Sequence, residues 1–208
     1  MKYPKLRELK EALRSLFSKP YTTKFPAVEI EPVDGFRGKP KYFEEYCIGC
    51  GACAEVCPAN AITVIDPEEP VDLSKGTPIR KVECRYDMCN FCGNCEANCI
   101  TDKGIQLTKE YDLALFDRNL AEESIEHELV ICDICHSIIT TRNHLAWLVR
   151  KLGTLAYGNP NLLIISQQEL IPVETGEKSE ELRRPDMMKL LCPKCRHKID
   201  LKDIWGEG

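Results

Sequence analysis

Most of the chain's 13 cysteines fall into two runs with the same spacing, and this repeat constrains the fold more than any other feature. The runs are Cys47, Cys50, Cys53 and Cys57, followed by Pro58, and Cys89, Cys92, Cys95 and Cys99. Both match the C-x2-C-x2-C-x3-C spacing that holds 4Fe-4S clusters in bacterial ferredoxins. Zinc sites usually use cysteine pairs that are well separated in the sequence, and disulfide frameworks belong mainly to secreted proteins. The repeat therefore predicts two 4Fe-4S clusters.

The spacing also predicts which cysteines share a cluster. A tight loop presents three thiolates to one cubane but cannot easily reach its fourth iron, so the last cysteine of each run serves the other cluster. The first cluster is therefore assigned to Cys47, Cys50, Cys53 and Cys99, and the second to Cys89, Cys92, Cys95 and Cys57. This exchange of ligands requires the two clusters to be near neighbours in one compact fold.

Details around the runs give further expectations. The apolar segments AITVI and GIQLT follow the two runs and suit a small pair of strands. The long linker between Cys57 and Cys89 contains three prolines and suggests an inserted loop. Ile100 stands where a second proline would follow the run, which leaves an extra N–H that can bond a sulfur. Cys84 lies outside both runs and is expected to be a buried free thiol rather than a ligand.

The last four cysteines form a different pattern, two C-x2-C pairs far apart in the sequence. Four thiolates from two such loops suit a closed tetrahedral zinc site that stabilises a small domain. A third iron-sulfur centre and a pair of redox thiols remain as alternatives. Between the pairs, an apolar helical face ends at Gly153 and is expected to belong to a core. The expected zinc ligands are Cys132, Cys135, Cys192 and Cys195.

These patterns predict an α+β chain in three parts. Residues 1–35 form an N-terminal amphipathic arm, because Leu6, Leu9 and Leu13 with their neighbours share one face of a helix and prolines follow. Residues 36–117 form a bacterial 2[4Fe-4S] ferredoxin-like domain. Residues 118–208 form a C-terminal four-cysteine zinc-binding domain.

Charge and missing motifs exclude other classes of function. The net charge of −5, with both signs well mixed, gives no global basic field that would attract nucleic acid. No stretch is apolar and long enough to span a membrane, and the charged N-terminal residues do not resemble a secretory signal, so a reducing compartment is expected. The sequence also lacks a Rossmann fingerprint and a P-loop, so catalysis is expected to belong to other chains.

The order of these features resembles a known family. The amphipathic start is followed by the sequence FRGKP at residues 36–40, the two cysteine runs, the sequence EYDLA at residues 110–114, and the two C-x2-C pairs. This order is similar to the ferredoxin-type electron-transfer subunit of formate hydrogenlyase and other group 4 membrane-bound NiFe hydrogenases. That subunit is related in turn to the diferredoxin subunit in the peripheral arm of respiratory complex I.

The resemblance implies a subunit that relays electrons inside such a complex and is no enzyme by itself. Its expected partners are the small NiFe hydrogenase subunit, the membrane arm and an electron-input module, at the cytoplasmic side of the cell membrane and peripheral to it. A free soluble diferredoxin is the main alternative. A zinc module that binds nucleic acid, with structural clusters, is a weaker one, because its basic run lacks aromatic residues for stacking on bases. That run is Lys194, Arg196, His197, Lys198 and Lys202.

Overall fold

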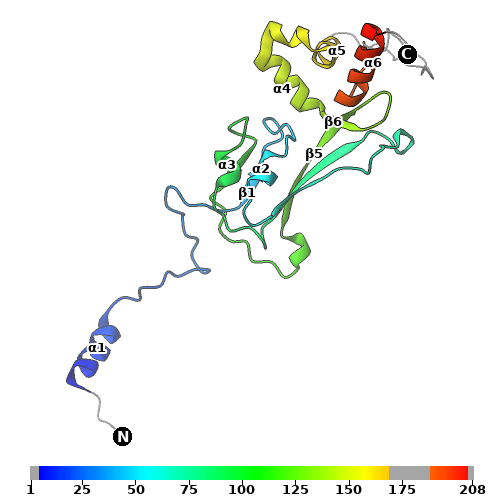
Figure 1. The fold of residues 1–208 in the computed structure, drawn as a ribbon. Coiled ribbons are helices and arrows are strands. Elements are labelled where there is room, and N and C mark those ends of the chain that lie inside the picture. Colours follow the sequence, from blue (N-terminus) through cyan, green and yellow to red (C-terminus); the bar gives the residue numbers. More distant parts are fainter. Residues whose placement is uncertain (1–4, 169–187, 206–208) are drawn as a thin grey trace. The chain divides into compact units, whose positions relative to one another are not determined.

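The computed structural model describes residues 5–168 and 188–205 (Figure 1). They belong to two compact units, residues 1–35 and residues 36–208. Of the helices in these ranges, none combines the length and the apolar character that crossing a bilayer requires.

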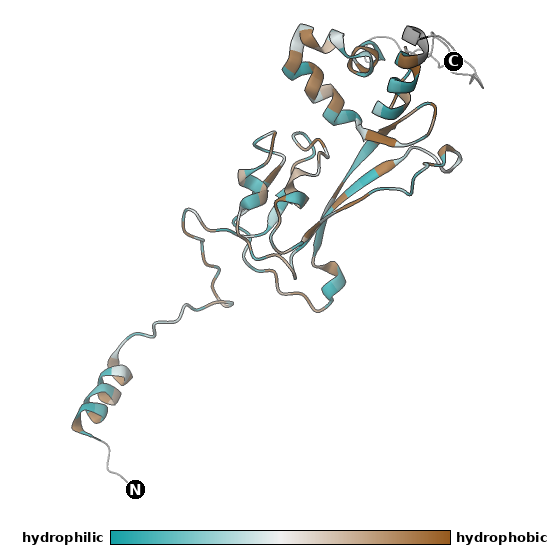
Figure 2. Ribbon diagram, in the orientation of Figure 1, coloured by the Kyte–Doolittle hydropathy of each residue, from teal (hydrophilic) through white to brown (hydrophobic). Residues whose placement is uncertain are grey.

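The first unit contains one helix, α1 (Leu6–Phe17), where the sequence predicted it. Its leucines and Phe17 share one face, seen as brown segments among teal ones in Figure 2, and none of its residues is buried within the unit. The side chain of Glu8 accepts a hydrogen bond from the backbone N–H of Lys5, which stabilises the start of the helix. The described residues of this unit therefore leave the apolar stripe of α1 uncovered.

The second unit is built on two antiparallel sheets. The larger sheet has the strand order β2-β3-β5-β6, and the smaller one pairs β1 with β4. Two short helices, α2 (Ala52–Glu55) and α3 (Asn94–Ala97), lie inside the two cysteine runs. The strands are β1 (Pro40–Tyr42), β2 (Ile62–Ile65), β3 (Ile79–Arg85), β4 (Ile105–Leu107), β5 (Glu122–Ile131) and β6 (Ile138–Thr141).

The expected pairing of the two apolar segments is wrong. Segment AITVI contains β2, which pairs with β3, while segment GIQLT contains β4, which pairs with β1. Each segment therefore finds its partner outside the repeat. Strand β3 lies in the long linker, so that linker supplies a central strand of the sheet as well as a loop with the short 3-10 helix at Leu73–Lys75.

The main core lies between these sheets and the cysteine runs. Buried side chains at Val82 and Cys84 come from alternate positions of β3 and therefore point to the same face. They pack with residues of β1, β2 and β4 and with cysteines of both runs. The core thus places the two runs around shared apolar side chains.

Strand β5 continues the sheet past the boundary expected near residue 118. Its first seven residues pair with β3, from Glu122 opposite Arg85 to Glu128 opposite Ile79, and its end pairs with β6. The sheet therefore joins the ferredoxin-like residues directly to the C-terminal cysteines.

In its described residues the second unit also contains the α-helices α4 (Arg142–Leu152), α5 (Pro160–Gln168) and α6 (Pro193–Trp205). The Thr141 side chain caps the start of α4 by accepting a hydrogen bond from the His144 backbone, and Gly153 ends the helix with a positive φ, as predicted. Leu145 of α4 packs with residues of β5 and α5 in a second core. A third core surrounds the C-terminal cysteines.

Candidate iron-sulfur and four-cysteine metal sites

Two small cavities of about 20 Å³ each lie beside the cysteine runs. Cys47, Cys50 and Cys53 line the first cavity together with Cys99 from the other run. In the same way, three cysteines of the second run line the second cavity together with Cys57 from the first. The structure therefore gathers the eight cysteines in the two crossed groups that the spacing predicts.

The donor set at these cavities suits a group that supplies positive charge. Burial raises the pKa of Cys47 to about 11, that of Cys53 to about 12 and that of Cys95 to about 11. Thiols of this kind stay protonated unless cations lie close to the sulfur. The irons of a 4Fe-4S cluster are such cations and favour four thiolates in a closed, apolar space. The residues present therefore fit two such clusters.

Cys84 is buried as expected, but it lines the second cavity beside the predicted ligands. Val82, two residues earlier on β3, lines the first cavity, so this strand contributes one side chain to each cavity. Its thiol is hydrogen-bonded to Cys89, which lowers the pKa of Cys89 and raises that of Cys84. The side chain is thus a neighbour of a predicted ligand rather than a remote apolar filler.

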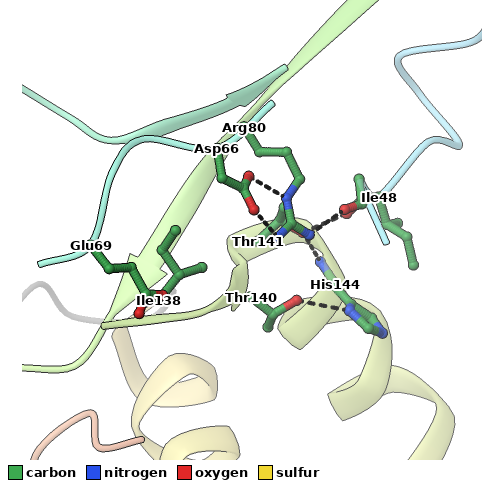
Figure 3. Close-up of polar contacts among 9 residues, drawn as sticks. Ile48, Asp66, Glu69, Arg80, Ile138, Thr140, Thr141 and His144 are labelled. Carbon is green, nitrogen blue, oxygen red and sulfur yellow. Dashed lines mark hydrogen bonds and ion pairs between the residues drawn. The ribbon is translucent and has the colours of Figure 1, made fainter. Parts of the chain in front are cut away.

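The loop at the first cavity is fixed by side chains from the larger sheet (Figure 3). Arg80 donates to the carbonyl of Gly49 at 3.0 Å and is itself held by two hydrogen bonds to Asp66, at 2.8 and 2.7 Å. The buried hydroxyl of Thr141 donates to the carbonyl of Ile48. Since these groups sit on β3 and at the end of β6, the sheet determines where Cys47 and Cys50 lie.

The FRGKP segment holds the second loop. Arg37 donates to the carbonyl of Cys92 at 2.8 Å. Gly38 passes so close to the chain at residues 108–110 that an added Cβ would lie 2.2 Å from the Glu110 carbonyl oxygen. The ammonium group of Lys39 lies 3.1 Å from a carboxylate oxygen of Glu123 and over the ring of Tyr86. Arg37 therefore contacts the second cysteine run directly, while Gly38 and Lys39 fix the segment against its neighbours.

The C-terminal cysteines also come together. The sulfur atoms of Cys132, Cys135, Cys192 and Cys195 all lie within 4.8 Å of one another. The first pair lies in the turn between β5 and β6, and the second pair at the start of α6. Backbone and side-chain hydrogen bonds between Asp133 and Leu190 connect the two pairs. Segments about 60 residues apart in the sequence therefore close one site.

The geometry of these four thiols suits a tetrahedral metal ion. Sulfur atoms about 2.3 Å from a zinc ion lie about 3.8 Å from each other, which is compatible with the observed separations. Burial raises the pKa of Cys132 and of Cys195, so these two thiols become thiolates only with a cation close to them. Arg196, from the basic run next to this site, donates to Asn161 and to the carbonyl of Lys189, while the side chain of Lys202 lies outside the described part of the chain.

Sequence reasoning missed the side chains that surround the first loop. Arg80, His127, Thr141 and Asn143 lie 30 or more residues from it in the sequence, and no local motif connects them. One signal was present. Strand β5 alternates along Ile125, His127 and Leu129, so His127 stands at a position that faces the core and is 4% exposed.

Known proteins with similar sequences agree with this geometry. Residues 46–103 match the model of the 4Fe-4S dicluster domain family, which indicates 4Fe-4S clusters in this part of the chain. The NAD(P)H-quinone oxidoreductase subunit I of Gloeobacter violaceus is 32% identical over 139 residues, which cover 67% of this chain and 61% of that protein.

Two further relatives match over larger parts of their own length. NADH-quinone oxidoreductase subunit I 2 of Geobacter metallireducens is 33% identical, over 55% of this chain and 88% of that protein. Formate hydrogenlyase subunit 6 of Escherichia coli is 32% identical, over 63% of this chain and 68% of that protein. The chain therefore belongs to the family of 4Fe-4S dicluster proteins that contains subunit I of NADH-quinone oxidoreductases and formate hydrogenlyase subunit 6.

Proposed function

We propose that this chain is an electron-transfer subunit that holds two 4Fe-4S clusters and one zinc ion within a membrane-associated oxidoreductase complex of the hydrogenase type. Each bound cluster accepts and releases one electron. The ligands are the two crossed groups of four cysteines described above, and the zinc ligands are the four C-terminal cysteines.

The crossed lining of the two cavities carries this proposal. Cys57 ends the run that begins at the first cavity but lines the second, and Cys99 does the reverse. Chain segments only a few residues long therefore connect the two sites, and shared core residues such as Ile62 and Ile105 fill the space around them. Two redox groups held this close exchange electrons without movement of the protein.

The protein's own residues have three tasks in this function. Arg80 and Thr141 fix the first loop, and Arg37 fixes the second, so that neither loop rearranges when the charge at its sulfurs changes. The apolar core packs against cysteines of both runs and so limits the contact of their sulfurs with water. The zinc site closes the turn of the β5-β6 hairpin, and this hairpin contacts the first loop through His127 and Thr141.

Two features support a place in a larger complex. The apolar face of α1, with Leu6 85% exposed and Phe17 83% exposed, suits burial against a partner subunit. The stripe is too small to hold the chain on lipid by itself, which favours docking on a membrane subunit. The relative from formate hydrogenlyase supports a hydrogenase-type complex, and the quinone oxidoreductase relatives support a membrane-associated one.

The test is anaerobic purification of the natural complex and of the chain alone. The chain alone should contain two 4Fe-4S clusters by Mössbauer spectroscopy and, after full reduction, a paramagnetic resonance spectrum broadened by interaction between two neighbouring spins. In the cell extract, the chain should co-purify with the large subunit of a NiFe hydrogenase. A single cluster contradicts the cofactor assignment, whereas two clusters in a chain that purifies without partners indicate a free diferredoxin.

A further inference from the structure

A buried histidine from the C-terminal half of the sheet reaches a cysteine of the first cavity. His127 of β5 places its Nε2 atom 3.3 Å from the sulfur of Cys47, across 80 residues of sequence. Its other ring nitrogen, Nδ1, lies 3.3 Å from the side-chain amide nitrogen of Asn143, near the start of α4. The imidazole ring therefore connects an amide donor on one side to a predicted cluster ligand on the other.

The contact with Asn143 determines which nitrogen of the ring carries the proton. An amide nitrogen only donates hydrogen bonds, so Nδ1 of His127 must accept, and the proton of the neutral ring resides on Nε2. A cysteine thiolate accepts hydrogen bonds and donates none. The His127 ring therefore directs an Nε2–H group at the Cys47 sulfur.

Packing keeps this donor in place. Gly49 has φ of +64°, and an added Cβ there would lie 2.7 Å from Cδ2 of the His127 ring and 2.9 Å from Cγ2 of Thr141. The ring therefore packs directly on the loop between Cys47 and Cys50. Because Arg80 and Thr141 hold the carbonyls of the same loop, the distance between nitrogen and sulfur is fixed by contacts on several sides.

The second cavity has no matching donor among the described residues. There the sulfurs accept backbone N–H groups, Cys89 from Phe91 at 3.4 Å and Cys57 from Ala61 at 3.3 Å. Cys89 also has the Cys84 thiol as its neighbour, while Arg37 bonds a carbonyl rather than a sulfur. The two runs have the same spacing, yet an imidazole donor reaches only the first. Hydrogen bonds to ligand sulfurs stabilise the more negative, reduced state of an iron-sulfur cluster and so raise its reduction potential.

We propose that His127, oriented by Asn143, is a positioning residue that raises the reduction potential of the cluster bound by Cys47, Cys50, Cys53 and Cys99. The inference rests on the proposed function, because it requires that both clusters are bound. His127 lies on β5, and the predicted zinc ligand Cys132 follows five residues later, directly after the end of this strand. The inference therefore gives the C-terminal half of the chain a role in setting a reduction potential.

The test compares His127→Phe with the wild-type chain in redox titrations followed by paramagnetic resonance. We expect one midpoint potential to become more negative and the other to stay unchanged, with wild-type iron content. His144→Phe is the matched control, because its ring bonds Thr140 and lines neither cavity. His127→Gln, which keeps an N–H donor of shorter reach, should recover part of the difference.

A second measurement begins with the wild-type chain. In the reduced wild-type chain with 15N-labelled histidine, pulsed paramagnetic resonance should detect one histidine nitrogen coupled to one cluster. This coupling should persist in His144→Phe and disappear in His127→Phe. It remains decisive if His127→Phe loses its cluster. Two intact clusters without a coupled histidine overturn this inference alone, whereas a wild-type chain without 4Fe-4S signals overturns the proposed function and the inference together.

Discussion

Replacing Gly49 by alanine tests whether the first loop and the sheet behind it form one tightly packed site. The new methyl group would lie 2.7 Å from the His127 ring and 2.9 Å from Thr141, and both neighbours are buried. Overpacking of this kind costs about 1 to 3 kcal/mol. The positive φ of +64° adds a backbone cost of about 1 to 2 kcal/mol for any residue with a Cβ.

Gly153→Ala is the control for this overpacking. Gly153 has a similar φ of +56°, but nothing lies within 4 Å of a Cβ added there. This control therefore places an alanine at another positive-φ position without overpacking, with a ψ of −128° and away from the first loop. The overpacking alone, about 1 to 3 kcal/mol, corresponds to a loop that opens at least about 5 to 150 times more often in Gly49→Ala.

The assay is the anaerobic loss of cluster absorbance in the presence of excess iron chelator, with paramagnetic resonance to identify which cluster is lost. The cluster at Cys47 should be lost at least about 5 to 150 times faster in Gly49→Ala than in Gly153→Ala, and the other cluster should follow later. Equal rates in the two variants would refute the tight packing of His127 and Thr141 on this loop. Preferential loss of the cluster at Cys89 would refute the assignment of Gly49 to the first cavity.

Metal analysis of the anaerobically purified chain should give about eight irons and one zinc, in line with two four-iron clusters and one four-thiolate zinc site; four irons, or no zinc after chelator washing and remetallation, would contradict the assignment. Cys57→Ala should damage the cluster bound by Cys89, Cys92 and Cys95 more than the cluster beside it in the sequence, and conversion of the Cys47 cluster to a three-iron form would show that the crossed pairing is wrong. Cys132→Ser should release the zinc and leave the iron content near the wild-type value, as measured by elemental analysis, and loss of a cluster's iron would instead indicate that the four C-terminal cysteines hold a redox centre. Leu9→Glu with Leu13→Glu should prevent co-purification with partner subunits at unchanged iron content, with Glu8→Gln on the polar side of α1 as control; unchanged co-purification would exclude this face as the docking surface.

The part of the structure that local chemistry determines was predictable from the sequence. The spacing of the cysteine runs predicted the crossed grouping around two cavities, and the amphipathic patterns predicted α1 and α4 with its end at Gly153. The two C-x2-C pairs predicted a single four-thiol site, and the structure brings these four sulfurs together.

Long-range strand pairing was not predictable in this way. Segments AITVI and GIQLT are both good strands, but period-two alternation does not specify a partner, so the pairing with β3 and β1 had to come from the fold. Strand β3 lies in the linker between the two cysteine runs, where three prolines predicted a loop. His127 and Arg80 reach the first loop from strands far away in the sequence, where no spacing rule connects them to Cys47 or Gly49.

The crossed cysteines also set the order in which the protein can mature. Three cysteines of the first cavity are made early in translation, but the fourth, Cys99, follows about 50 residues later. A nascent chain that ends before Cys99 therefore offers an incomplete site to the iron-sulfur assembly machinery, although its first run is intact. With the proposed crossed ligation, complete loading of either cluster has to wait until both runs have left the ribosome and met each other, so cluster insertion and folding of the ferredoxin core are expected to be coupled.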